Sequence, residues 1–121
     1  MRRAPAQRFQ ELIVWQKSHT LVLEVYRFSA TFPAHETYGL RAQLRKAAVS
    51  VPANIAEGFK RQSPLDKARI MNIAEASLEE VRYYFLLAQD LGYGDTTPML
   101  ARGGEVARLL SAYCQKVRAS A

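Results

Sequence analysis

The chain has 121 residues and a mass of 13.6 kDa, and 49% of its residues are hydrophobic while 23% are charged. This composition excludes collagen-like, low-complexity and disordered chains, and the length fits one domain with one core. Seventeen Lys and Arg against eleven Asp and Glu give a formal net charge of +6, which is compatible with a nucleic acid or an acidic partner and requires neither.

The first amphipathic segment predicts a helix over residues 9–30. Its apolar positions recur at intervals of three and four, the spacing of one helix face turned to a core: Leu12, Trp15, His19, Val22 and Tyr26. Phe32-Pro33 ends this helix, because proline has no backbone donor and restricts the residue before it. A loop is expected from there to about Tyr38.

A second helix is predicted from about Tyr38 to Gly58 or just beyond it. Its core positions follow the same spacing: Leu44, Ala48, Val51 and Ile55. Pro52 lies inside this helix and cannot donate to the carbonyl of Ala48. Ser50 is the nearest hydroxyl that could satisfy that carbonyl.

The third helix has the strongest periodic pattern in the chain. Ser63 is a favourable N-cap, Pro64 suits the first helical position, and Asp66 places a negative charge in the first turn. Gly92 supplies a C-terminal stop. The apolar positions between these ends alternate four and three residues apart: Met71, Ala74, Leu78, Val81, Phe85 and Ala88.

Thr97-Pro98 repeats the capping pattern at the start of a fourth helix, and the pair Gly103-Gly104 weakens the helix, so it is expected to start late. Its apolar positions are Val106, Leu109, Leu110, Tyr113 and Val117. Four amphipathic helices joined by short loops predict an all-α protein, an antiparallel up-and-down four-helix bundle over residues 9–121. A basic N-terminal arm, residues 1–8, precedes the bundle.

The residues that carry most enzyme chemistry are missing from the sequence. No Glu is followed three residues later by His, which excludes the di-iron pattern of helical bundles, and His19 and His35 have no partner at metal-ligand spacing. Gly-rich phosphate-binding motifs are also absent. Cys114 is expected to pack in the core. We therefore expect no catalytic residue, no metal and no cofactor, and the protein is not expected to be an enzyme.

Compartment and membrane contact follow from the same inventory. A single cysteine excludes an internal disulfide, so nothing calls for an oxidising compartment and the expected location is the cytoplasm. The basic start runs into amphipathic sequence without an apolar stretch, which is unlike a signal peptide. The longest apolar runs are far shorter than the roughly 20 residues that span a bilayer, so no membrane is expected as a partner.

A polar stripe runs along the second helix beside its apolar one. It consists of Gln43, Lys46, Ser50, Asn54, Glu57 and Arg61. Such a stripe is most often solvated surface. The alternative is that Asn54 and Glu57 are partly buried and hydrogen-bonded across helices or across subunits.

A longer pattern of motifs resembles a known family. The pattern comprises Trp15-Gln16-Lys17, Phe32-Pro33, Tyr38-Gly39-Leu40, the run from Gln43 to Gly58 that contains Ser-Val-Pro-Ala-Asn-Ile-Ala-Glu-Gly, Ser77-Leu78, Glu80 and Leu91-Gly92-Tyr93. It is similar to the four-helix-bundle proteins named after open reading frames in 23S rRNA intervening sequences, relatives of the accessory variability protein of diversity-generating retroelements. The similarity covers residues from about Phe9 to Val117. Lys67 departs from it, because the family tends to carry an aromatic residue there.

The resemblance implies a ring-like homopentamer without enzymatic activity, and nucleic-acid binding has been proposed for some relatives. The motif positions are expected to be structural or oligomer-facing: Arg45, Ser50, Pro52, Asn54, Glu57, Gly58, Ser77 and Glu80. Tyr83 and Tyr84 are candidates for the interface between copies, and packing within the bundle is an equally good reading of them.

Charge divides unevenly along the chain, with residues 36–61 at +3 and residues 62–95 at −3. The basic second helix and the acidic third helix can pair with each other, either within a protomer or across a ring of copies. The candidate nucleic-acid-binding residues are Arg2, Arg3, Arg8, Arg41, Arg45, Lys46, Lys60 and Arg61. Two functions remain open: a homo-oligomeric scaffold that binds itself and a partner protein, and a protein that binds structured RNA or DNA through basic patches.

Overall fold

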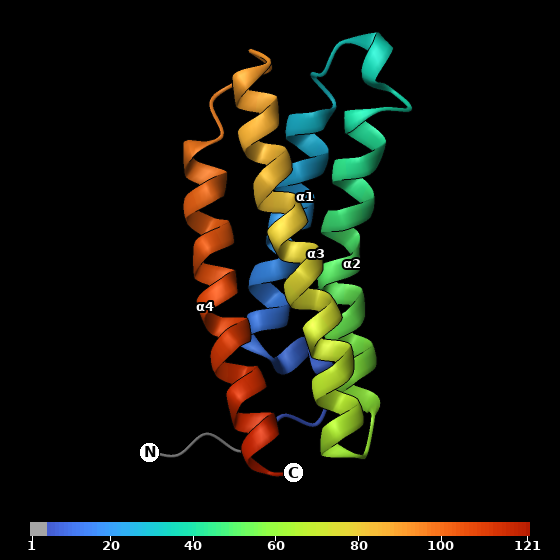
Figure 1. The fold of residues 1–121 in the computed structure, drawn as a ribbon, viewed down its shortest axis with the longest axis vertical. Helices are drawn as coiled ribbons and strands as arrows, with labels where there is room; N and C mark the ends of the chain where they lie inside the picture. The colour runs from blue at the N-terminus through green and yellow to red at the C-terminus, as the bar shows by residue number, and fades with distance from the viewer. Residues whose placement is uncertain (1–4) are drawn as a thin grey trace.

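The computed structural model of the chain describes residues 5–121. They form four α helices, α1 (Ile13–Ser29), α2 (Leu40–Lys60), α3 (Pro64–Asp90) and α4 (Thr97–Ala119), with the single 3-10 turns η1 (Phe9–Glu11) and η2 (Ala34–Glu36). The helices alternate in direction (Figure 1). α1 and α3 each pack against both α2 and α4, which confirms the predicted up-and-down four-helix bundle.

The predicted core positions of α2 and α3 are all buried, including Leu44, Leu78 and Phe85 at 1% exposure or less. In α4, Val106, Leu110 and Val117 are buried, whereas Leu109 and Tyr113 are half-buried at the edge of the core. Cys114 lies in the core as predicted. Burial of these stripes against one another supplies the main driving force for folding.

The predicted core face of α1 is wrong by a rotation of the helix. His19 and Tyr26 are exposed, and the buried face of the helix is made by Val14, Ser18, Leu21, Val22, Val25 and Ser29. Two serines face the core because their hydroxyls donate to carbonyls of their own helix, from Ser18 to Trp15 at 2.9 Å and from Ser29 to Tyr26 at 3.5 Å. These bonds satisfy the hydroxyl protons, Ser29 also accepts a hydrogen bond from Arg45, and the small volume of both serines lets α1 approach its neighbours.

The beginnings of α1 and α4 also differ from the prediction. Leu12 has an extended backbone, so Phe9–Glu11 is a separate turn and the helix starts at Ile13. α4 does not start late but runs without interruption from Thr97 through both glycines. A Cβ on Gly103 would lie 3.3 Å from Cγ of Arg82, so the glycine lets that side chain pack directly on α4.

The turns on either side of α3 use recognisable capping contacts. Ser63 accepts a hydrogen bond from the backbone N–H of Asp66 at 3.4 Å, as predicted. Gly92 has a φ of 82°, and the N–H of Tyr93 donates to the carbonyl of Ala88 at 2.9 Å, which closes the helix. At α4 the predicted cap is replaced: the carboxylate of Asp95 accepts from the Thr97 N–H at 3.0 Å.

Candidate functional site

The polar stripe of α2 contains a hydrogen-bonded cluster at its centre. The hydroxyls of Ser50 and Ser77 lie 2.8 Å apart and join α2 to α3. The amide of Asn54 donates to both the carbonyl and the hydroxyl of Ser50, at 2.8 and 2.9 Å. Asn54 is therefore partly buried, as one reading of this stripe expected, but its hydrogen bonds stay within α2, and Ser50 makes the contact between helices.

This cluster corrects the expectation about Pro52. The Ser50 hydroxyl does not bond the carbonyl of Ala48 that proline frees; it bonds Ser77 and Asn54 instead. Pro52 itself is buried and helps to line a groove between α1 and α2. The proline therefore contributes an apolar surface in the middle of α2.

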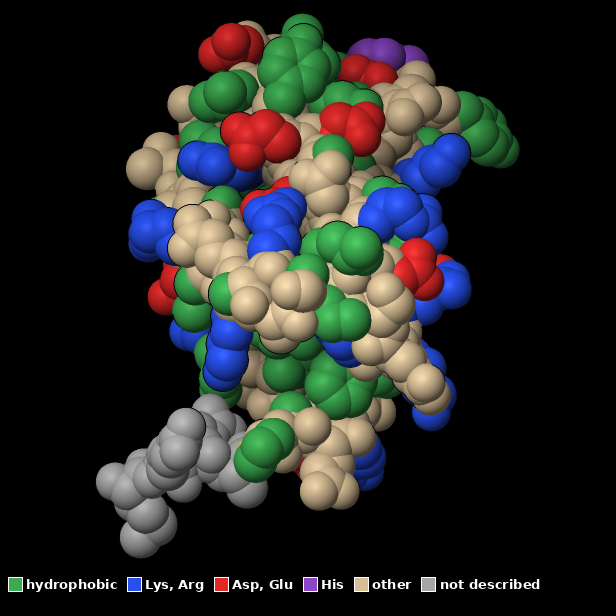
Figure 2. Space-filling view, turned by 60° about the horizontal axis from the view of Figure 1, so that its bottom comes forward, with side chains coloured by type: hydrophobic (Ala, Val, Ile, Leu, Met, Phe, Trp, Pro, Cys, Tyr) green, Lys and Arg blue, Asp and Glu red, His purple; other side chains and the backbone are tan. Residues whose placement is uncertain are grey.

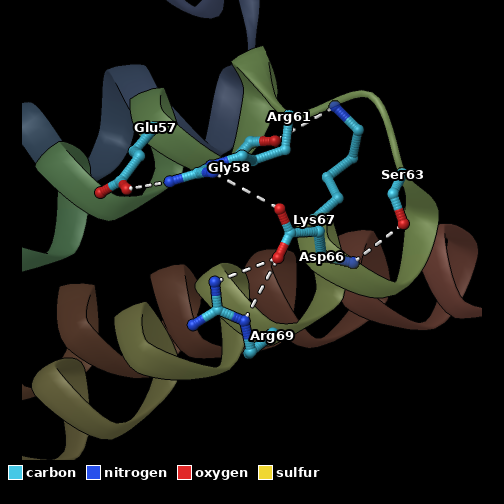
Figure 3. Close-up of polar contacts among 7 residues, drawn as sticks. All are labelled: Glu57, Gly58, Arg61, Ser63, Asp66, Lys67 and Arg69. Atoms are coloured by element: carbon cyan, nitrogen blue, oxygen red, sulfur yellow. Dashed lines mark hydrogen bonds and ion pairs between the residues drawn. The ribbon is translucent and has the colours of Figure 1, made fainter.

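The turn between α2 and α3 is held by a chain of charged groups (Figure 3). Arg61 contacts Glu57 at 2.8 Å and Asp66 at 3.5 Å, and the other carboxylate oxygen of Asp66 accepts from Arg69 at 3.0 Å. Glu57 thus bonds within its own helix and not across to another. These side chains are substantially exposed, so the pairs position the turn more than they stabilise it.

Gly58 and Lys67 complete this turn from the inside. A Cβ on Gly58 would lie 2.8 Å from Cε of Met71, so the glycine allows α2 and α3 to come close together. The ammonium of Lys67 donates to the carbonyls of Gly58 and Phe59 at 3.1 and 2.7 Å, and its burial lowers the pKa of Lys67. Lys67 caps the C-terminus of α2, which explains how a cation is accommodated where the family tends to have an aromatic residue.

Arg41 and Arg45, two of the candidate nucleic-acid-binding residues, are engaged at the C-terminus of α1. Arg41 donates to the carbonyl of Ser29 at 3.1 Å. Arg45 donates to the hydroxyl of Ser29 at 2.8 Å and to the carbonyl of Tyr26 at 3.1 Å, with its guanidinium 4.4 Å from the centre of the Tyr26 ring. Both arginines satisfy the last carbonyls of α1 and complement its dipole, so their first role is structural.

Within one chain, basic α2 and acidic α3 pair very little with each other. Among residues 5–121, only Arg61 and Asp66 form an ion pair between these helices. Glu75 contacts Arg118 of α4 at 3.7 Å, and Glu79 contacts Arg82 of its own helix at 3.3 Å. Glu80 accepts from the hydroxyl of Tyr84 at 3.1 Å. Arg41 and Arg45 of α2 instead donate hydrogen bonds to carbonyls at the C-terminal end of α1.

The remaining positive charge lies at one end of the bundle. The half that contains the α2–α3 turn, residues 5–20, 51–76 and 108–121, carries nine Lys or Arg and four Asp or Glu, whereas the rest of the described chain carries six and seven. Figure 2 shows acidic side chains gathered towards the opposite end, at the top of the picture. On the face drawn in Figure 2, the basic side chains are separated by apolar and uncharged ones and form no continuous patch.

Two apolar surfaces lie on the outside of the bundle. The first, which we call the α3 stripe, consists of Leu65, Ile73, Tyr83 and Leu86, with Leu65 and Tyr83 exposed by 73% and 57%. The second, the α1–α2 groove, has a volume of about 350 Å³ and an almost wholly apolar lining. Its walls are Phe9, Trp15, His19, Val22, Val49, Pro52, Ala53 and Ala56.

Cys114 of α4 is a buried thiol. Burial, together with the nearby carboxylate of Glu75, raises the pKa of Cys114 to about 12, so its thiol stays protonated at neutral pH. Within residues 5–121 no three His, Cys, Asp or Glu side chains are grouped so as to hold a metal ion. No helix in that range combines the length and the hydropathy of a bilayer span.

Comparison with known proteins places this bundle in a family. The family model described as 23S rRNA-intervening sequence protein matches residues 10–112. The chain belongs to this family. No curated protein matches the chain. The family match covers the α2 motif, the Ser50–Ser77 contact and the capping arginines, so the resemblance drawn from those motifs is confirmed.

Three basic residues of the described chain lie outside the residues that match the 23S rRNA-intervening sequence protein family: Arg8, Lys116 and Arg118. Arg8 contacts Glu11 at 3.7 Å. The candidate residues Arg2 and Arg3 lie outside the described residues. Lys46 and Lys60 are exposed.

One contact that sequence reasoning missed joins the loops at the far end of the bundle. The hydroxyl of Tyr93 donates to Glu36 at 2.7 Å, and the other oxygen of Glu36 accepts from the N–H of Leu40 at 3.0 Å. Both hydrogen bonds lower the pKa of Glu36, and the bond to Glu36 raises the pKa of Tyr93. Glu36 therefore satisfies the N-terminus of α2 in place of a capping side chain at Gly39, and the only sequence signal was the position of an acid before a helix.

Proposed function

We propose that this protein is a non-enzymatic scaffold that assembles with copies of itself, most simply as a pentamer in the cytoplasm, and presents a repeated surface to a partner protein. The observation that carries this proposal is the α3 stripe. Leu65 and Tyr83 are separated by about five turns of helix, so they point the same way from α3. A row of large apolar side chains on one outward face is typical of an interface.

The α1–α2 groove is the surface that we propose receives the α3 stripe of the next copy. Stripe and groove lie on different helices, so their contact is heterologous and closes into a ring when the rotation between copies permits. Charges favour the same pairing, because α2 carries exposed Lys46 and Lys60 beside the groove while α3 carries exposed Glu79 and Glu80 beside the stripe. Within the described chain Glu79 and Glu80 bond only Arg82 and Tyr84 of their own helix, so contacts with lysines of the next copy remain open to them.

The mass in solution tests this proposal. Sedimentation or light scattering of the full chain at micromolar concentration is expected to give a mass several times 13.6 kDa. Tyr83→Asp places a charge in the centre of the stripe and is expected to give a folded species of lower mass. Leu23→Asp, a similar change at an exposed position of α1, is the control and should keep the parent mass. A monomeric parent would contradict the proposal.

A second function, binding of structured RNA or another polyanion, is favoured by the excess of basic residues at one end of the bundle. Phosphate contacts release counterions, so the logarithm of affinity should fall by roughly 0.7 to 0.9 for each tenfold rise in salt and each phosphate neutralised. The basic end, and not the capping arginines of α2, is the surface that we propose for this contact.

A charge-matched pair of variants tests this second function. Lys60→Ala/Lys116→Ala removes two exposed cations from the basic end, and Arg27→Ala/Lys46→Ala removes two from the other half. Fluorescence anisotropy with a structured RNA at low salt should show weaker binding for the first variant only. An equal loss of RNA affinity in both variants would contradict a localised site. Absence of RNA binding by the parent at low salt would contradict this second function altogether.

A further inference from the structure

A shallow depression lies between α3 and α4. It has a volume of about 440 Å³. Its lining includes Arg82, Gly104, Ala107, Arg108, Ser111 and Gln115. Two guanidiniums, a hydroxyl and an amide therefore surround one hollow, and none of the described residues that line it is acidic. The lining is rich in hydrogen-bond donors and positive in charge.

Gly104 of α4 is part of the lining of this hollow, and Gly103 lies next to it in sequence. A Cβ on Gly103 would lie 3.3 Å from Cγ of Arg82, and a Cβ on Gly104 would lie 3.6 Å from Nη1 of Arg108. Both arginines therefore fold over the part of α4 that lacks side chains. Two adjacent glycines in the middle of a helix weaken it, but they let the stem of Arg82 and the guanidinium of Arg108 approach the helix surface.

The two guanidiniums are not saturated by neighbouring acids. Arg82 has one contact with Glu79, at 3.3 Å, and the Glu79 side chain is 72% exposed. Arg108 makes no ion pair or side-chain hydrogen bond with any other residue in the range 5–121. Each guanidinium carries five N–H donors in a planar fork that matches the oxygens of a phosphate group. Most of these donors are free to bind an anion.

We propose that this depression binds a phosphate group, with Arg82 and Arg108 on its oxygens and Ser111 and Gln115 as additional donors. The group belongs to a free phosphate compound or to the backbone of a nucleic acid, since both present the same oxyanion. The site uses no residue of the α3 stripe or of the α1–α2 groove. It therefore stands independently of the proposed assembly, whereas Arg108 is one of the nine cations counted in the basic half of the chain.

Calorimetric titration of the full chain with inorganic phosphate, at constant ionic strength in chloride, tests the site. The parent is expected to bind phosphate saturably. Arg108→Gln is expected to weaken binding by about tenfold, because a charged hydrogen-bond donor is lost. Arg102→Gln is the matched control: it removes the same charge from α4, where Arg102 contacts Glu24 of α1 at 2.8 Å, and should leave the affinity unchanged.

For Glu79→Gln we expect the opposite change in affinity, and a gain in affinity cannot be caused by a loss of folding. Removing this carboxylate frees Arg82, so phosphate is expected to bind more tightly than to the parent. Gly104→Gln places a side chain in the hollow and is expected to abolish binding, with thermal unfolding in chloride as the check that it folds. Competition with a short single-stranded RNA distinguishes the sources: displacement of phosphate assigns a nucleic-acid backbone, and its failure assigns a small phosphate compound.

Two results would overturn the proposal. The first is a parent that shows no saturable binding of phosphate. The second is an affinity that changes equally in the Arg108→Gln and Arg102→Gln variants, because that would reflect net charge alone.

Discussion

At the scale of single residues, the arginines of α2 show how far charge alone can mislead. Arg45 and Lys46 are neighbours in sequence and both are basic, yet the first caps α1 and the second is exposed. The difference comes from where the last carbonyls of α1 lie, and a sequence carries no direct record of that position. Six of the eight candidate nucleic-acid-binding residues are described, and four of them, Arg8, Arg41, Arg45 and Arg61, contact other groups of the chain.

Replacement of Arg45 by Met is expected to lower the free energy of unfolding by about 1 to 3 kcal/mol. Two hydrogen bonds from a charged donor are lost, and the carbonyl of Tyr26 and the hydroxyl of Ser29 lose a partner. Arg27→Met is the control, since it removes an exposed charge outside the proposed interface, and should change stability by no more than about 0.5 kcal/mol. Urea denaturation measures both, and equal effects would contradict the capping role.

The contact between Tyr93 and Glu36 predicts a dependence on pH. The hydrogen bonds from the Leu40 N–H and the Tyr93 hydroxyl lower the pKa of Glu36 in the folded state below its ordinary value of 4.5. A lowered folded pKa means that the stabilisation is complete above the unfolded pKa and is lost as pH falls through the folded pKa. Acid should therefore erode the stability advantage of the parent over Glu36→Gln.

Tyr93→Phe isolates the hydroxyl, because the ring can still pack against Phe32. An NMR titration of the Glu36 carboxyl carbon in this variant is expected to give a higher pKa than in the parent. An unchanged pKa would show that the Tyr93 hydroxyl does not reach Glu36 in solution.

At the scale of helices, periodicity predicted α2 and α3 well and α1 less well. The predicted core positions of α2 and α3 are all apolar, so the hydrophobic pattern and the buried face of these helices coincide. On α1 the core face includes Ser18 and Ser29, while Trp15 and His19 stack with ring centres 5.0 Å apart beside the α1–α2 groove. Hydrophobicity alone predicts that the aromatic side of α1 is buried. The serine side is buried instead, because the Ser18 and Ser29 hydroxyls donate to carbonyls of their own helix and the side chains are small.

The glycines were also informative only in part. Propensity predicted that Gly103-Gly104 would delay α4, but packing against α3 overrides a local cost of about 1 kcal/mol for each glycine. Gly58 belongs to the sequence motif, and the structure explains why glycine stands there: a Cβ at this position would lie 2.8 Å from Cε of Met71. The candidate site could be read from the sequence as a set of residues on α2, but the division between capping, cross-helix and exposed members needed the bundle.

Gly58→Val is expected to destabilise the protein by about 1 to 3 kcal/mol, because the added carbons meet Met71 and Ile70 in a filled core. Ala42→Val adds carbons to an exposed position of the same helix and should cost far less. Thermal unfolding of the two variants gives the comparison. A Gly58→Val melt equal to that of Ala42→Val would show that α2 and α3 are not held this close at the turn.

At the scale of the whole molecule, the bundle has two kinds of surface left after folding. One is apolar, in the α3 stripe and the α1–α2 groove, and the other is basic, at the end with the α2–α3 turn. A monomer gains nothing from large exposed side chains such as Leu65 and Tyr83. Assembly through stripe and groove gives these side chains a partner and leaves the basic ends repeated around a ring, where weak contacts with a polyanion would add through avidity.

Cysteine cross-linking of copies tests this assembly most directly, since the native Cys114 is buried and does not interfere. One cysteine replaces Val49 in the groove and a second replaces Tyr83 on the stripe. Under mild oxidation the double variant is expected to give a ladder of disulfide-linked oligomers, while each single variant stays monomeric on a denaturing gel. Absence of the ladder, or dimers formed equally by either single variant, would contradict a stripe-to-groove assembly.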